Sequence, residues 1–209
     1  MSFNGNPTID QHRLKPQGER YFYSSTEWFF SLQDLERLKG LVKPTEPATV
    51  RASHEPQSVQ PALRSSMVSF IEPTADSSWL YEKIGEIIRF HNQTYYGYDI
   101  SGIEHLQFTE YPEGGGFYKP HMDWGSGMVM GRGDICRKLS FSIQLSNPDS
   151  YEGGDFRICT GEDFSAQSEK LRQFGTVIVF PSWVLHEVTP VTKGTRRSLV
   201  GWCVGPDFR

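Results

Sequence analysis

The chain has 209 residues, of which 37% are hydrophobic, and its 14 phenylalanines, 9 tyrosines and 5 tryptophans suffice for one sizeable core. Its 21 basic and 25 acidic residues are interspersed, so the basic surface typical of nucleic-acid-binding proteins is not expected. The sequence contains no run of about 18 apolar residues and no apolar N-terminal stretch. We therefore expect neither membrane association nor secretion.

The three cysteines, Cys136, Cys159 and Cys203, are odd in number and widely spaced. No Cys-x-x-Cys pair is present, so the sequence predicts neither a disulfide framework nor a zinc knuckle. Free thiols are typical of a reducing compartment, and we expect a cytoplasmic protein.

The first half of the chain predicts few regular elements. Residues 1–20 are polar and without periodicity, which indicates an extended arm. Leucines at helical spacing predict a short helix over 31–42, with a capping box formed by Ser31 and Asp34. Residues 43–66 contain four prolines and predict a long loop, either a lid near a site or a disordered insertion.

A strand over 67–71 and a longer helix over 76–95 follow. The helix shows one apolar face, and Asp76 or Ser77 is expected to cap it. The members of that face are Leu80, Ile84, Ile87, Ile88 and His91.

The second half is rich in short apolar runs separated by glycine, proline and asparagine, which predicts strands. The expected strands cover 104–111, 138–146, 155–159, 176–180, 184–191 and 197–204. Residues 137–146 alternate most regularly, with leucine, phenylalanine and isoleucine on one face. Their other face is polar and small, which suits either solvent or the lining of a wet cavity.

His121 and Asp123 form a His-x-Asp pair, and residues two apart on a strand point to the same side, so both side chains can reach one metal ion. A surface polar pair is the alternative. His186 lies in an apolar run and is a candidate third ligand, although a lone histidine there also suits a core position. Two imidazoles and one carboxylate are typical of non-haem Fe(II) oxygenases.

Arg196 follows His186 by ten residues. A planar guanidinium can bind the distal carboxylate of a chelating keto acid through two hydrogen bonds. Because Arg197 is adjacent, a basic hairpin turn is the alternative interpretation.

Several segments together resemble one family. They are Tyr111 to Asp123 (YPEGGGFYKPHMD), 137–145, 152–156 (EGGDF), and 180–196 with its FPS, HEVTPV and GTR motifs. In this order they resemble the Fe(II)/2-oxoglutarate-dependent oxygenases, and most closely the prolyl 4-hydroxylase-like branch with its PKHD-type hydroxylases. The resemblance covers about residues 106–208, with a weaker echo at Arg64-Ser65-Ser66.

The resemblance implies that His121, Asp123 and His186 are catalytic iron ligands and that Arg196 pairs with the distal carboxylate of 2-oxoglutarate. Tyr111 matches a tyrosine that touches this cofactor in many relatives, although it also suits a core position.

Other cofactor contacts are implied near Arg196. Gln144 falls where relatives often place a tyrosine on the cofactor, and an amide can still donate to a carboxylate. Ser198 and Trp202 share the face of Arg196 by period-two counting, so they are expected to line the cofactor pocket, although Trp202 also suits plain core. The glycine-rich segment 124–134 is interpreted as a mobile loop beside the metal.

The implied fold is mainly β with supporting helices, a double-stranded β-helix or distorted jelly roll. We expect one domain over 1–209, with a helical preface and flexible loop over 1–103 and the β-helix core over 104–209.

The resemblance implies a dioxygenase that uses Fe(II), 2-oxoglutarate and dioxygen, with ascorbate as a reductant. It would hydroxylate an unactivated C–H bond, in a prolyl residue of a protein or peptide, and release succinate and CO2. One alternative is a hydroxylase of a free amino acid or other small molecule. Another is a cupin-like metal-binding module without oxygenase activity, against which Arg196 argues because such a module needs no dicarboxylate anchor.

Overall fold

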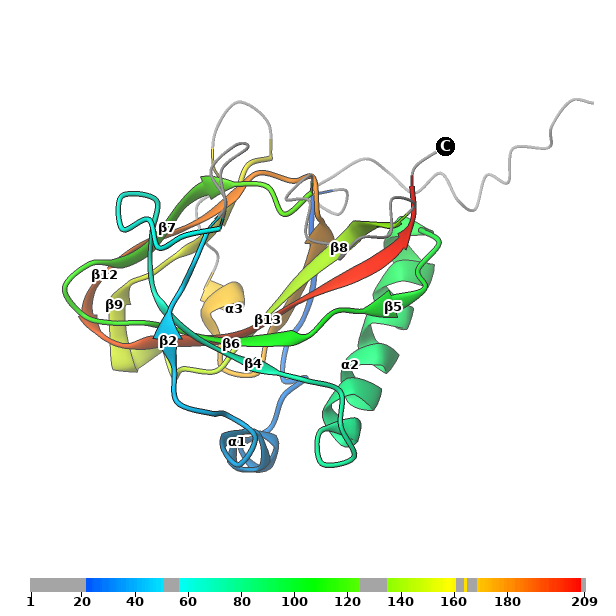
Figure 1. Ribbon diagram of the computed structural model, residues 1–209, viewed down its shortest axis with the longest axis horizontal. Coiled ribbons are helices and arrows are strands. Elements are labelled where there is room, and N and C mark those ends of the chain that lie inside the picture. Colours follow the sequence, from blue (N-terminus) through cyan, green and yellow to red (C-terminus); the bar gives the residue numbers. More distant parts are fainter. Residues whose placement is uncertain (1–21, 51–56, 125–134, 161–163, 165–168, 208–209) are drawn as a thin grey trace, which may run out of the picture.

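Two antiparallel sheets face each other, and two helices cover the larger sheet on its other side (Figure 1). The computed structural model describes residues 22–50, 57–124, 135–160, 164 and 169–207. Within these residues the expected strand-rich second half behind a helical preface is confirmed.

The larger sheet has eight strands among the described residues. In spatial order they are β1 (Ser24–Thr26), β11 (Val177–Pro181), β8 (Ile135–Gln144), β13 (Arg196–Pro206), β6 (Leu106–Tyr111), β4 (Met67–Ile71) and β2 (Glu46–Pro47), with β5 (Gly102–Ile103) beside β13. The long strands β8 and β13 pair over most of their length and form its centre.

The smaller sheet has five strands in the described part of the chain. Their order is β10 (Phe156–Ile158), β12 (His186–Gly194), β7 (Gly116–His121) and β3 (Arg64–Ser65), with β9 (Tyr151–Gly153) also beside β12. Strand β7 was not predicted, because Gly116, Lys119 and Pro120 interrupt any apolar alternation.

The side chains form two hydrophobic cores, one on each side of the larger sheet. Alternation along β8 sends Leu139, Phe141 and Ile143 toward the helices, where Leu38 and Leu80 meet them. The second core lies between the sheets and contains Tyr111, Ile178, Phe180, Val184 and Val188, among others. Because both sides of the larger sheet are covered, the polar face of β8 is also buried.

Helix α1 (Leu32–Lys39) begins with the predicted capping box. The Asp34 amide donates to the Ser31 hydroxyl, and the Ser31 amide donates to the Asp34 carboxylate. Lys83 of the second helix forms an ion pair with Asp34 at 2.9 Å, which ties the two helices together.

Helix α2 (Ser78–His91) continues into a π-helical turn, Asn92–Tyr96, that ends at Gly97 with a positive φ. Its predicted apolar face is confirmed, although Ile87 is only partly buried. The expected side-chain cap is wrong: Ser77 occupies the N-cap position, but its hydroxyl donates to the Glu72 carbonyl and does not reach the helix amides.

The interpretation of 43–66 as a loop is wrong at two places. Glu46–Pro47 pairs with β4 at the edge of the larger sheet, and Arg64–Ser65 pairs with β7 in the smaller one. Both strands are two residues long, too short for a periodic signal. The expected N-terminal arm and most of the glycine-rich segment 124–134 lie outside the described residues.

Candidate active site

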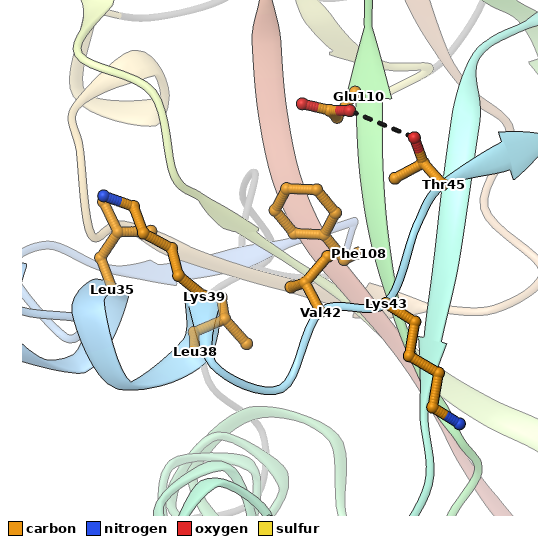
Figure 2. A pocket seen from close by; sticks show the side chains of 8 residues that line it. All are labelled: Leu35, Leu38, Lys39, Val42, Lys43, Thr45, Phe108 and Glu110. Atoms are coloured by element: carbon orange, nitrogen blue, oxygen red, sulfur yellow. Dashed lines mark hydrogen bonds between the residues drawn. The ribbon is translucent and has the colours of Figure 1, made fainter.

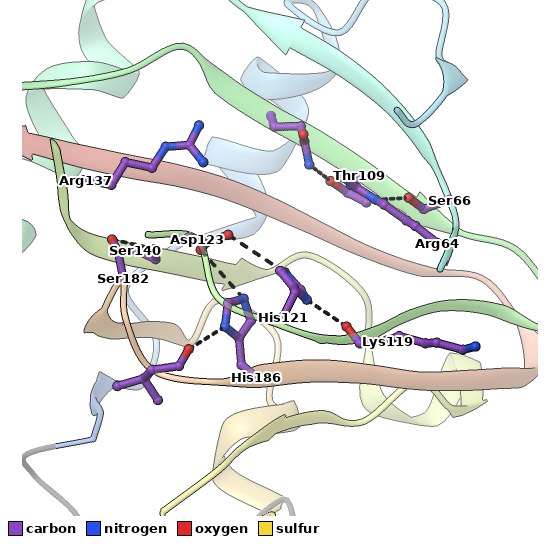
Figure 3. Close-up of polar contacts among 12 residues, drawn as sticks. Arg64, Ser66, Thr109, Lys119, His121, Asp123, Arg137, Ser140, Ser182 and His186 are labelled. Carbon is purple, nitrogen blue, oxygen red and sulfur yellow. Dashed lines mark hydrogen bonds and ion pairs between the residues drawn. The ribbon is translucent and has the colours of Figure 1, made fainter. Parts of the chain in front are cut away.

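Three ligand-type side chains meet between the ends of two neighbouring strands. His121 is the last residue of β7, His186 is the first of β12, and the two residues are partners in the ladder. Asp123 lies two residues beyond β7. The nitrogen and oxygen atoms they offer all lie within 4.8 Å of one another, a spacing that could hold one metal ion (Figure 3).

Hydrogen bonds to carbonyl groups turn both imidazoles the same way. His121 Nδ1 lies 2.8 Å from the Lys119 carbonyl oxygen, and His186 Nδ1 lies 3.0 Å from that of Val184. These contacts make Nδ1 the donor, so Nε2 carries the lone pair that a metal needs. The Nε2 atoms lie 3.8 Å and 3.6 Å from the two Asp123 carboxylate oxygens, respectively.

Asp123 is held by the turn between β11 and β12. The Ser182 carbonyl accepts hydrogen bonds from the amides of both Asp123 and Trp124, at 2.9 and 2.8 Å. The expectation that His121 and Asp123 share a strand face is wrong in this detail, because the strand has ended and a bend aims the carboxylate. The pair converges on one point nevertheless.

The protonation states suit metal binding. Burial, with a further contribution from His186, lowers the pKa of His121 to about 3, so its ring is neutral near pH 7. Burial alone would raise the pKa of Asp123, but His186, His121 and Arg137 together lower it below its ordinary value. The neutral imidazole of His121 and the ionised carboxylate of Asp123 are forms that coordinate a divalent ion, and the donor set of two imidazoles and one carboxylate fits Fe(II).

A second cluster surrounds Arg196 between the sheets. Its side chain is 1% exposed, and no carboxylate of the described residues forms an ion pair with it. One guanidinium nitrogen, Nη2, donates to Gln144 Oε1 at 2.9 Å. A buried cation without an anionic partner is costly by several kcal/mol, so this arrangement calls for an anionic ligand.

The buried donors around Arg196 indicate which chemical groups that ligand would carry. Within the described chain, four buried side-chain atoms have no hydrogen-bond partner, and all four belong to β8 or β13. They are Gln144 Nε2, Arg196 Nε, Ser198 Oγ and Trp202 Nε1. Such atoms are rare in native proteins unless a water or ligand satisfies them. A carboxylate-bearing molecule such as 2-oxoglutarate would accept from these groups, so the residues present fit this cofactor.

The structure brings the predicted cofactor residues together. Arg196 pairs with Tyr111 across β13 and β6, and its guanidinium carbon lies 5.3 Å from the Tyr111 ring centroid. Ser198 pairs with Gln144 across β13 and β8. Trp202 lies further along β13, opposite Ser140, and it is 9% exposed.

Sequence reasoning missed several residues around Asp123. Arg137 donates to both carboxylate oxygens of Glu104, at 3.0 and 2.6 Å, and its guanidinium carbon lies 4.0 Å from the Trp202 ring centroid. The Ser140 hydroxyl lies 2.9 Å from that of Ser182 and helps to keep Asp123 ionised. Arg137 and Ser140 lie in the segment 137–145 and Ser182 lies in the FPS motif, but the resemblance gave none of the three a role.

A separate cavity of about 310 Å³ lies beside α1, on the outer side of the larger sheet (Figure 2). Leu35, Leu38, Val42 and Phe108 form its apolar walls. Glu110 at its edge accepts a hydrogen bond from Arg197 at 2.7 Å. None of the predicted site residues lines this cavity.

Comparison with known proteins finds a family likeness over the segment that carries the site. Residues 106–204 match the sequence model of the 2OG-Fe(II) oxygenase superfamily. A PKHD-type hydroxylase of Hyphomonas neptunium is 44% identical over 90 residues, which cover 42% of this chain and 38% of the relative. One from Gloeothece citriformis is 41% identical over 100 residues, 48% of this chain and 42% of the relative. The matches thus span about two fifths of these relatives' length.

Solved structures share the fold over most of the chain. A prolyl 4-hydroxylase of Pseudomonas putida superposes with a TM-score of 0.62 and 23% identity, covering 88% of this chain and 92% of that one. A prolyl hydroxylase of Trichoplax adhaerens, in complex with a peptide fragment, gives a TM-score of 0.63 at 16% identity, covering 88% and 83%. The predicted double-stranded β-helix is therefore confirmed.

In the part of the chain that the structure describes, no helix is both long and apolar enough to cross a membrane. The His-Asp-His cluster, the buried Arg196 and the family match all fall within residues 106–204. Through that segment the chain is similar to the 2OG-Fe(II) oxygenase superfamily, and its residues fit the cofactors Fe(II) and 2-oxoglutarate.

Proposed function

We propose that this protein hydroxylates a prolyl residue in a protein or peptide, using Fe(II), 2-oxoglutarate and dioxygen, with succinate and CO2 as co-products. The observation that carries the proposal is the buried Arg196, without an ion-pair partner in the described residues, beside three further donors that lack acceptors. A metal-binding module without a dicarboxylate cofactor would have no use for this group. We propose further that residues 1–209 form one oxygenase domain and that the protein acts in the cytoplasm.

The chain's own residues would divide the work as follows. His121, Asp123 and His186 would hold the iron through two imidazole nitrogens and one carboxylate. Arg196 would form an ion pair with the distal carboxylate of 2-oxoglutarate, and Gln144 would orient that guanidinium through its Oε1 atom. In a cofactor enzyme, the main contribution of the protein is to orient the cofactor and the substrate with fixed groups.

Neighbouring residues would complete the cofactor pocket. Tyr111 would form its wall beneath the guanidinium, and Ser198 and Trp202 would donate from β13. When bound, iron together with 2-oxoglutarate and dioxygen supplies the oxidising chemistry that converts a C–H bond into C–OH. Ascorbate would serve as an external reductant.

The prolyl substrate is proposed from the relatives. The similar sequences are named PKHD-type hydroxylases, and two of the structures that share the fold are prolyl hydroxylases, one of them bound to a peptide. A hydroxylase of a free amino acid or another small molecule would use the same metal site and is the outcome to be distinguished.

The first experiment tests the cofactor site. Metal-free protein is titrated anaerobically with Fe(II) and then with 2-oxoglutarate, and the visible charge-transfer band of the chelate is recorded. Arg196→Ala is expected to raise the 2-oxoglutarate concentration needed by about 100-fold, because a buried charge pair is lost. Arg197→Ala is the matched control, since its side chain points outward and pairs with Glu110. No band in the folded wild-type protein would contradict the oxygenase assignment.

The second experiment tests the substrate. Proline-containing peptides and free amino acids are incubated with the loaded enzyme, and each is analysed by mass spectrometry for the gain of one oxygen atom. Hydroxylated prolyl peptides are expected. Oxygen found only in a free amino acid would contradict the prolyl proposal while leaving the cofactor assignment intact.

A further inference from the structure

The ring of Tyr118 stacks directly on the imidazole of His121. Their centroids are 3.5 Å apart and their planes differ by 17°. Tyr118 precedes His121 by three residues on β7, and residues three apart on a regular strand point to opposite faces. The stack therefore requires an irregularity in the strand.

The register of β7 against β12 contains that irregularity. His186 pairs with His121, and Val188 pairs with Tyr118, so two steps along β12 face three along β7. This count is that of a β-bulge, which re-aims side chains near many active sites. Pro120 lies inside the bulge, where a residue without an amide hydrogen is tolerated. The bulge brings Tyr118 and His121 to the same side.

Arg64 contacts the same tyrosine ring. Its guanidinium carbon lies 4.6 Å from the Tyr118 centroid, and its Nε atom donates to the Ser66 hydroxyl at 2.7 Å. Arg64 is buried and pairs with Tyr118 across β3 and β7. The Arg64-Ser65-Ser66 segment, which carried only a weak family resemblance, thus lies beside the candidate metal site.

The two imidazoles differ in how the chain supports them. His186 is packed against Phe156 and Phe180, with centroids 5.6 and 4.7 Å away, and its side chain is 6% exposed. His121 stands at the end of its strand, and its side chain is 18% exposed. The hydrogen bond from its Nδ1 atom fixes the position of that nitrogen. The imidazole ring could still turn about the axis of this hydrogen bond. Tyr118 restricts this rotation by covering the ring.

We propose that Tyr118 and Arg64 are positioning residues for His121: the tyrosine ring sets the plane of the imidazole, and the guanidinium holds the tyrosine. This inference rests on the metal site of the proposed function. Residues behind metal ligands typically change metal affinity by about 10- to 100-fold when they are removed.

Co(II) binding to the metal-free protein of residues 1–209 tests the proposal, because the visible bands of Co(II) report both affinity and coordination geometry. Tyr118→Leu removes the ring and is expected to weaken Co(II) binding at least about 10-fold and to alter the bands. Tyr118→Phe retains the ring and is expected to restore wild-type affinity and bands. Arg64→Gln is expected to weaken binding by about two- to fivefold.

Tyr151→Leu is the matched control. Its ring, on β9 of the smaller sheet, belongs to another arginine–tyrosine contact, in which the guanidinium carbon of Arg172 from helix α3 (Glu169–Arg172) lies 4.4 Å from the Tyr151 centroid. This variant is expected to lower the melting temperature but to leave the Co(II) affinity of the folded protein unchanged.

Wild-type affinity and bands in Tyr118→Leu would overturn the proposal, as would a Tyr118→Phe variant as weak as Tyr118→Leu. If Tyr118→Leu does not fold, Arg64→Gln decides, and unchanged Co(II) bands and affinity there would overturn it. No Co(II) binding to the wild-type protein would overturn the metal site and this inference together. Failure of the peptide assay alone, with the Co(II) results as expected, would overturn only the proposed substrate.

Discussion

On strand β8, Leu139, Phe141 and Ile143 point toward the helices, whereas Ser140 and Gln144 point toward the smaller sheet, and all these side chains are buried. On the helix side, the apolar side chains of β8 pack against other side chains of the same core. The pocket side retains donors without acceptors and a cation without an anion in the described residues. Both faces of this strand are therefore buried, but only the pocket face has polar groups that lack partners in the described residues. The helix side should govern stability, and the pocket side should govern ligand binding.

Among the substitutions that test the difference between the two faces, Phe141→Ala is expected to have the largest effect. The Phe141 ring fills the space beside Gly201, where an added Cβ would lie 2.3 Å from it. Its removal should lower the free energy of unfolding by about 3–5 kcal/mol, measured by urea denaturation. The 2-oxoglutarate affinity of the folded protein should not change. A large loss of affinity with little loss of stability would break the distinction between the two faces.

The pH dependence of stability should come partly from His91 on the helix side. Its ring nitrogens lie 2.6 and 2.9 Å from the hydroxyls of Ser24 and Thr26, and burial lowers its pKa from 6.5 to about 4. The unfolded chain therefore binds the proton first as the pH falls. The stabilisation is complete above pH 6.5 and is lost between 6.5 and about 4, by up to about 3 kcal/mol.

His91→Gln provides the control, because an amide keeps the hydrogen-bonding capacity and does not titrate. The difference in unfolding free energy between the two proteins should shrink as the pH falls from 6.5 to 4. The other titrating groups contribute equally to both proteins and so do not affect this difference. A difference that stays constant over this range would refute the assignment.

On the pocket side, Arg196→Met should separate stability from binding. The change removes a buried cation, so the melting temperature of the cofactor-free protein should stay close to that of the wild type. In the wild type, metal plus 2-oxoglutarate at about 100 times the dissociation constant should add about 2.7 kcal/mol of stability. Calorimetry should show that 2-oxoglutarate no longer adds to the stability of the variant. Strong destabilisation of the cofactor-free variant would mean that Arg196 is a structural residue.

The smallest effect is expected from Ser31→Ala at the start of α1. Loss of the capping hydroxyl leaves the Asp34 amide unsatisfied and should cost about 1 kcal/mol in urea denaturation. Ser31→Thr should retain most of the stability, because threonine also caps. Any change in cofactor affinity would contradict the separation of the two sides.

The elements that sequence predicted well carry long, regular signals. The alternation along β8 reflects one apolar face and one polar face, both buried, and the helical pattern of α2 reflects one buried side over several turns. Strand β7 was missed because its bulge and Pro120 break the period-two pattern. The edge strands β2 and β3 owe their existence to partners distant in sequence, which no local pattern encodes.

The candidate site was predicted mainly through family motifs, and the structure adds what motifs do not contain. His121, Asp123 and His186 do meet, and Arg196 does lie buried beside Gln144. The support given by Tyr118 and the Ser182 carbonyl depends on a bulge and a turn. Such features arise from tertiary pairing and have no signature in residue spacing.

The Ser182 carbonyl, which accepts from the amides of Asp123 and Trp124, also has a kinetic consequence. It joins the loop after β7 to the turn after β11, so the three ligands converge only after the distant strands have paired. Contacts between segments far apart in sequence form late, because the intervening chain must first be closed into a loop. A metal ion that needs all three ligands then has no site in the folding transition state. Bound metal should consequently slow the unfolding rate while leaving the refolding rate nearly unchanged.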